Sequence, residues 1–99
     1  MNIAIEKYNE LRKQALTDVV ETATEGKYVY LDTCYTMDHG YETMGFPASS
    51  PDAKKPDSWG ELYCLTRQYD SFDEAKEGHK EVIELIKTKE YHELEECFW

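Results

Sequence analysis

The central part of the chain, residues 28–46, constrains the fold more than any other segment. Aromatic and β-branched residues dominate two runs within it, residues 28–37 and residues 41–46. Side chains of these types favour β-strands. Between the two runs lies the sequence Asp38-His39-Gly40, in which the glycine is free to adopt a positive φ. The segment therefore predicts a β-hairpin with a short turn.

Helical periodicity is found on both sides of this hairpin. In residues 1–26, apolar side chains recur at helical spacing from Ile3 to about Thr24, which predicts an amphipathic helix ending near Gly26. Towards the C-terminus, Ser71-Phe72-Asp73-Glu74 is typical of a capping box at the start of a helix. That helix is predicted over residues 71–96, and its apolar stripe contains Phe72, Ala75, His79, Val82, Ile83 and Ile86.

A proline-rich loop, residues 47–58, separates the hairpin from a third predicted strand, Trp59–Tyr69. The order is therefore helix, three strands, helix, in a single domain over residues 1–99. Short connections favour antiparallel pairing of the strands. We expect an α+β fold of the type α-β-β-β-α, with a three-stranded antiparallel sheet and two helices packed on one of its faces.

Charge and cysteine content indicate the general class of protein. The 99 residues carry a net charge of −10. The sequence has no signal-peptide pattern, and it has no apolar run of about 18 residues, the length that is needed to span a bilayer. We therefore expect a cytoplasmic protein with no membrane partner. The chain has three cysteines, Cys34, Cys64 and Cys97. This odd number favours thiols over a disulfide framework. No nucleophile elbow or phosphate-binding glycine loop is present, which predicts a protein that is not an enzyme.

Four residues form a candidate metal site: Cys34, His39, Cys64 and His79. His79 lies on the apolar stripe of the last predicted helix and should face the sheet, where the other three are expected. Two thiolates and two imidazoles suit the tetrahedral shell of a structural zinc ion. Glu42 or Asp38 is an alternative ligand in place of one cysteine. The competing interpretation is a packed, hydrogen-bonded His79 and a Cys64 that serves as a small apolar residue.

Residues 70–96 contain ten acidic residues and four lysines, and so carry −6 of the net charge. Four of the acids form a ridge opposite the apolar stripe: Asp73, Glu77, Glu81 and Glu84. Pairing from glutamate to lysine at i,i+4 is poor along this ridge, so successive acids repel one another. Such a surface repels nucleic acid and attracts the basic grooves of nucleic-acid-binding proteins. A solvated acidic face without a partner is one alternative. A tyrosine-rich sheet face is another candidate contact surface.

Two segments, residues 35–46 and 69–79, resemble small accessory proteins of phages and prophages of Gram-positive bacteria. They contain the runs Tyr41-Glu42-Thr43-Met44-Gly45-Phe46 and Glu74-Ala75-Lys76-Glu77-Gly78-His79. The similarity covers residues 28–85 and departs at Gly45, where the pattern has valine. Glycine at this place predicts a bulge or an edge position. The resemblance implies a phage accessory protein, and the anti-CRISPR proteins are small acidic proteins of that origin.

Two functions of different classes follow from these observations. The first is an anti-CRISPR-type inhibitor that binds a basic surface of a bacterial RNA-guided type II nuclease and blocks DNA loading. It would make contact through the acidic ridge, without binding nucleic acid itself, and would hold one structural zinc ion if the metal site exists. The alternative is a phage metal-binding regulator or a small metal-dependent enzyme that uses the histidine and cysteine cluster.

Overall fold

The computed structural model describes residues 3–97, and the side chains of these residues except for residues 3–5, 8 and 12. Residues 1 and 2 of the predicted N-terminal helix lie outside this range. The fold is α+β, as predicted, but it has more elements than expected. In chain order they are α1 (Ile3–Arg12), β1 (Leu16–Glu21), β2 (Tyr28–Thr36), β3 (Gly40–Ala48), the 3₁₀ helix η1 (Tyr63–Leu65), β4 (Arg67–Tyr69), α2 (Phe72–Thr88) and α3 (Tyr91–Glu96).

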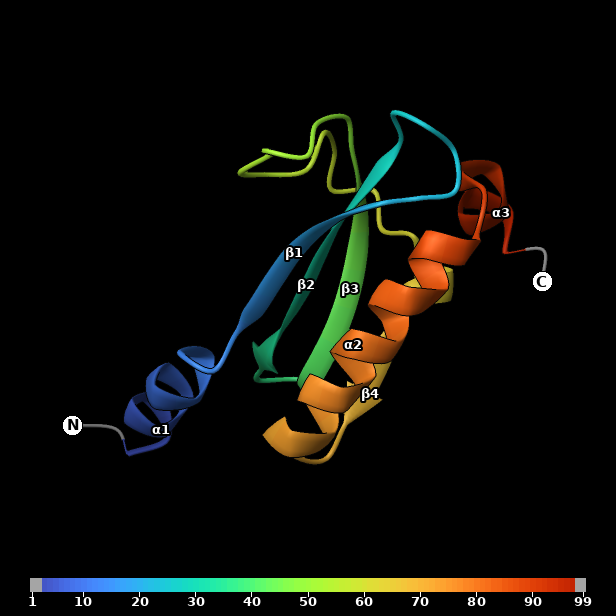
Figure 1. Cartoon of the computed structure of the whole chain (residues 1–99). Helices are drawn as coiled ribbons and strands as arrows, with labels where there is room; N and C mark the ends of the chain where they lie inside the picture. Colours follow the sequence, from blue (N-terminus) through green and yellow to red (C-terminus); the bar gives the residue numbers. More distant parts are fainter. Residues whose placement is uncertain (1–2, 98–99) are drawn as a thin grey trace.

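The strands form one antiparallel sheet in the order β1-β2-β3-β4, and α2 crosses one face of it (Figure 1). The predicted hairpin is confirmed: β2 and β3 pair in continuous register, and Gly40, which follows the turn as the first residue of β3, has a φ of 71°. On β2, Val29, Leu31 and Thr33 are fully buried. Alternate residues of a strand share a face, so these three side chains lie together on the face beneath α2.

The predicted helix over residues 1–26 is wrong beyond Arg12, because residues 16–21 form strand β1. Leu16, Val19 and Val20 are compatible with helical spacing, but β-branched residues are frequent in this segment and favour strands. All six residues of β1 pair with β2, and this pairing outweighs the local periodicity. Figure 1 shows α1 beyond the N-terminal end of β1, away from α2. The expectation of two helices on one sheet face is therefore also corrected.

The third strand predicted over residues 59–69 is reduced to β4, and η1 takes the place of its middle part. Leu62 and Leu65 are both buried. In a 3₁₀ turn, residues three positions apart project in the same direction, so both leucines reach the core, as a strand would not allow. The N–H of Leu62 donates to the carbonyl of Gly45 at 2.8 Å, which ties this turn to β3.

The single C-terminal helix predicted over residues 71–96 is interrupted between α2 and α3. Lys89 is extended, with a ψ of 141°, and its carbonyl accepts a hydrogen bond from the N–H of Ala23 at 2.8 Å. The N–H of Tyr91 donates to the Thr24 hydroxyl at 2.9 Å. The connection between β1 and β2 therefore forms hydrogen bonds with backbone groups that would bond within the helix if the helix were continuous. Glu90 then starts α3 with its own capping box.

Cys64 of η1 and Cys97 at the end of α3 form a disulfide, with their Cα atoms 5.5 Å apart. The prediction that these two residues are thiols is wrong. They are 33 positions apart in the sequence, and they meet only because α3 folds back against η1. Disulfides are typical of oxidising compartments, so the bond does not favour the expectation of a cytoplasmic protein, which rests on the missing signal-peptide pattern.

Gly45 lies opposite Leu31 in the continuous register of β2 and β3, so the predicted bulge is wrong. A Cβ atom at this position would lie 2.8 Å from Cδ1 of Leu65 and 3.2 Å from Cγ1 of Val29. We expect Gly45→Val to lower the free energy of unfolding by about 1–3 kcal/mol, because the added side chain overpacks the core. Urea denaturation would measure this. Gly60→Ala in the exposed loop is the control, and an equally small effect of both substitutions would contradict the prediction.

Candidate functional site

The four acids of the predicted ridge are all exposed on α2, and Glu81 lies at the side of the ridge that faces β4. The side chains of Asp73, Glu77 and Glu84 are 92%, 72% and 73% exposed. Each of these three forms an ion pair with a lysine three positions on, at 3.3 to 3.5 Å. Pairing at i,i+4 is poor, as predicted, but the lysines compensate for it in part by pairing at i,i+3. Among the described residues, Glu81 has no ion-pair partner.

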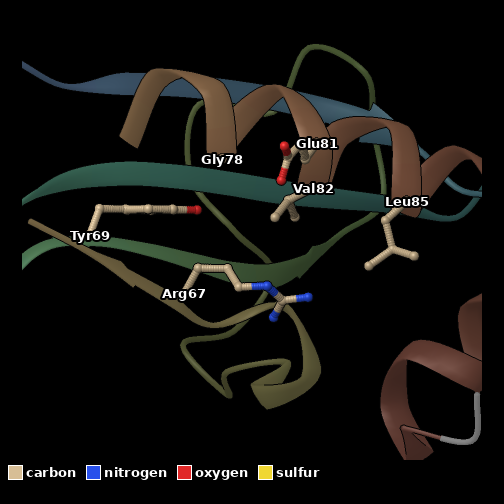
Figure 2. Close-up of a pocket in the computed structure, with 6 residues that line it drawn as sticks. All are labelled: Arg67, Tyr69, Gly78, Glu81, Val82 and Leu85. Carbon is tan, nitrogen blue, oxygen red and sulfur yellow. The ribbon is translucent and has the colours of Figure 1, made fainter. Parts of the chain in front are cut away.

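Glu81 borders a pocket of about 270 Å³ between α2 and the edge strand β4. Figure 2 shows its carboxylate on the α2 side, with the guanidinium of Arg67 on the β4 side. Six residues line the pocket: Arg67, Tyr69, Gly78, Glu81, Val82 and Leu85. The pocket thus combines one cation, one anion, one phenol and two apolar side chains. The sequence did not indicate it, because it forms where two elements meet.

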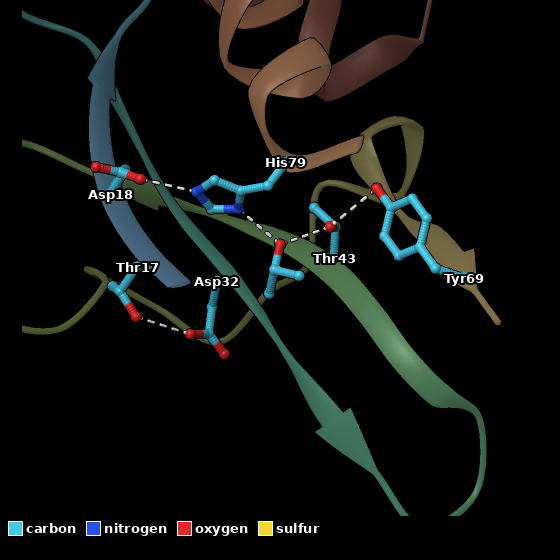
Figure 3. Close-up of polar contacts among 7 residues, drawn as sticks. Thr17, Asp18, Asp32, Thr43, Tyr69 and His79 are labelled. Atoms are coloured by element: carbon cyan, nitrogen blue, oxygen red, sulfur yellow. Dashed lines mark hydrogen bonds and ion pairs between the residues drawn. The ribbon is translucent and has the colours of Figure 1, made fainter. Parts of the chain in front are cut away.

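His79 faces the sheet, as predicted, and only 3% of it is exposed. Its Nε2 atom lies 2.7 Å from a carboxylate oxygen of Asp18 on β1, and its Nδ1 atom lies 2.7 Å from the hydroxyl of Thr33 on β2. Hydrogen bonds continue from Thr33 to Thr43 on β3 at 2.6 Å, and from Thr43 to Tyr69 on β4 at 3.1 Å (Figure 3). One polar chain therefore crosses all four strands and ends at the pocket.

The directions of the hydrogen bonds between the hydroxyl groups follow from the single proton that each hydroxyl carries. The Thr43 hydroxyl donates to Tyr69, so its single proton is not available to Thr33. Thr33 is then left to donate its own proton to Thr43. On the other side of the His79 ring, Nε2 faces the carboxylate of Asp18. The hydroxyl proton of Tyr69 remains free to bond elsewhere.

The structure does not assemble the predicted metal ligands: Cys34, His39, Cys64 and His79. Cys64 is in the disulfide, and both ring nitrogens of His79 are hydrogen-bonded. Cys34 follows Thr33 on β2 and therefore faces away from His79, while His39 is exposed in the turn. Of the alternative ligands, only Glu42 lies opposite Cys34. Within residues 3–97, no three histidine, cysteine or acidic side chains are arranged as a metal site.

Comparisons with protein-family models, with curated proteins and with solved structures gave no significant match to this chain. The resemblance to phage accessory proteins therefore stays a prediction, and the function is argued from the residues themselves. In the described part of the chain, no helix has the length and apolar character needed to cross a membrane.

Proposed function

We propose that this protein is an inhibitor that binds a basic, nucleic-acid-binding surface of another protein through the acidic ridge of α2. The partner that we propose is a bacterial RNA-guided type II nuclease, as the resemblance to phage accessory proteins implies. The bound ridge occupies the place of DNA phosphates and so blocks DNA loading. The observation that carries this proposal is the exposure of all four ridge acids on one side of a single helix: Asp73, Glu77, Glu81 and Glu84.

The dimensions of the ridge suit this role. Asp73 and Glu84 are eleven positions apart, which corresponds to about 16 Å along a helix. Phosphates follow one another at about 3.4 Å along the axis of one DNA strand, so the ridge is as long as about five nucleotide steps. Val82 and Ile86 anchor the opposite side of α2 in the core. The acids are therefore held on a rigid support and need little ordering when a partner binds.

The lysines on α2 reduce the negative potential of the ridge but do not block it. Exposed ion pairs of this type contribute only about 0–1 kcal/mol each, so a basic partner can replace the lysines at small cost. The net charge of −10 also attracts a basic partner over longer distances. This attraction is screened by salt, so inhibition should weaken as ionic strength rises.

A double charge reversal tests the ridge. We expect Glu77→Lys with Glu84→Lys to abolish inhibition, because it replaces two contact charges with like charges facing the partner. The control is Glu25→Lys with Asp52→Lys, two exposed positions away from α2. Both variants change the net charge from −10 to −6, since each substitution adds two positive charges. Thermal melting would confirm that both variants are folded.

The readout is a gel shift of guide-loaded type II nuclease on its target DNA, titrated with each form of the protein. Loss of the shifted band with the wild type and the control, but not with the ridge variant, would support the proposal. An unaffected band with excess wild type would overturn the proposed partner. Equal loss of inhibition in both variants would overturn the ridge as the contact surface, because net charge alone would then explain the effect.

A further inference from the structure

We propose that the pocket between α2 and β4 binds a free α-amino acid with an aliphatic side chain. This proposal does not depend on the inhibitor function. Arg67 and Glu81 present opposite charges from opposite sides of the pocket (Figure 2). A ligand that carries both a carboxylate and an ammonium group matches both charges at once. The volume of about 270 Å³ is small compared with pockets for drug-sized ligands, of about 300–1,000 Å³, and suits a ligand of few atoms.

Arg67 is positioned to bind the carboxylate of such a ligand. Its Nη1 atom donates to the carbonyls of Cys64 at 2.8 Å and Thr66 at 2.9 Å. These two bonds hold the guanidinium in place and leave the N–H groups of Nη2 and Nε for a ligand. A guanidinium fixed in this way suits bidentate recognition of a carboxylate.

Tyr69 adds a second donor on the same side of the pocket. Its oxygen accepts from Thr43, so its own hydroxyl proton is free to be donated to the ligand. Gly78 leaves room for the Tyr69 ring, because a Cβ atom at residue 78 would lie only 2.2 Å from Cε1 of Tyr69. The glycine on α2 and the hydrogen-bond chain from the sheet therefore fix the phenol together.

Glu81 is suited to bind the ammonium group. Its carboxylate is exposed and forms no ion pair within the described residues, so no internal partner has to be displaced. Val82 and Leu85 continue the same wall along α2 and offer an apolar surface to an aliphatic side chain. The two charged groups and the apolar part of the ligand thus each meet a side chain of matching chemistry.

The test is an NMR titration of the intact protein with three probes that share the same isobutyl group. Leucine carries both charged groups, isocaproate lacks the ammonium group, and isoamylamine lacks the carboxylate. We expect leucine to shift the amide resonances of Tyr69 and Gly78, and each half-ligand to bind at least about tenfold more weakly. Failure of leucine to shift these resonances, or equal binding of leucine and one half-ligand, would overturn the proposal.

Two variants on α2 test the role of Glu81. Glu81→Gln keeps the shape of the side chain and removes its charge, while Glu84→Gln removes a charge of the same helix outside the pocket. We expect leucine affinity to fall at least about tenfold in the first variant and to stay unchanged in the second. Equal affinity of both variants would overturn the assignment. The ridge experiment alters Glu77 and Glu84 and leaves the pocket intact, so the two proposals fail independently.

Discussion

Replacing His79 with alanine is expected to lower the free energy of unfolding by about 3 kcal/mol. The substitution removes a ring that is 97% buried and leaves a cavity beneath α2. It also removes one of the two hydrogen-bond partners of Thr33, whose side chain is fully buried and has no access to water. Asp18 loses its hydrogen-bond partner on α2 at the same time. Urea denaturation of the variant and the wild type would measure the difference.

His92→Ala is the matched control for this experiment. His92 lies on α3 and is exposed, so its loss should change the free energy of unfolding by less than about 0.5 kcal/mol. A similar small change for His79→Ala would show that the polar chain across the sheet does not stabilise the fold. It would also remove the argument that this chain holds Tyr69 in place at the pocket.

Loss of the disulfide between Cys64 and Cys97 is expected to lower the free energy of unfolding by about 3–4 kcal/mol. The bond closes a loop over a sequence separation of 33 residues, and a loop of this length restricts the unfolded chain by about that amount in the chain-entropy model. The variant that carries Cys64→Ser and Cys97→Ser tests this by urea denaturation. Undocking of α3, whose Leu94 is fully buried, would contribute to the loss.

The reductant dithiothreitol supplies the control for the disulfide. It should destabilise the wild type by a similar amount, and it should leave the double serine variant unaffected. If the wild type has the same stability with and without reductant, either the bond does not form or it does not restrict the unfolded chain. Mass spectrometry with a thiol-specific label separates these two outcomes, and either one contradicts the prediction.

Local signals predicted the parts of the fold that depend on neighbouring residues. Ser71 caps α2, and its side chain accepts from the N–H of Glu74 at 3.2 Å, as the capping pattern indicates. The burial of His79, Val82 and Ile86 follows from the 3.6-residue period of the helix. Gly40 adopts a positive φ directly after the turn. In each case the feature depends on residues a few positions apart, so the local sequence pattern is sufficient to predict it.

The same kind of signal failed for residues 16–21, because period alone does not distinguish a short strand from a continued helix. The helix predicted over residues 1–26 includes Asp18, and its periodicity gives no signal for the pairing of Asp18 with His79. The sequence does contain a signal for another member of the polar chain, because Thr33 shares the period-2 face of Val29 and Leu31. The partner of that hydroxyl was not predictable without the packing of α2 on the sheet.

The sequence by itself determined the α+β class, the central hairpin, the start of α2 and the acidic ridge along its exposed side. These features follow from backbone preferences and helical periodicity, which act between residues close in the chain. Only the tertiary structure decided the strand identity of β1, the interruption before α3, the disulfide and the pocket between Arg67 and Glu81. Each of these joins segments far apart in the sequence, and the free energy that selects them comes from contacts that exist only after the chain has packed.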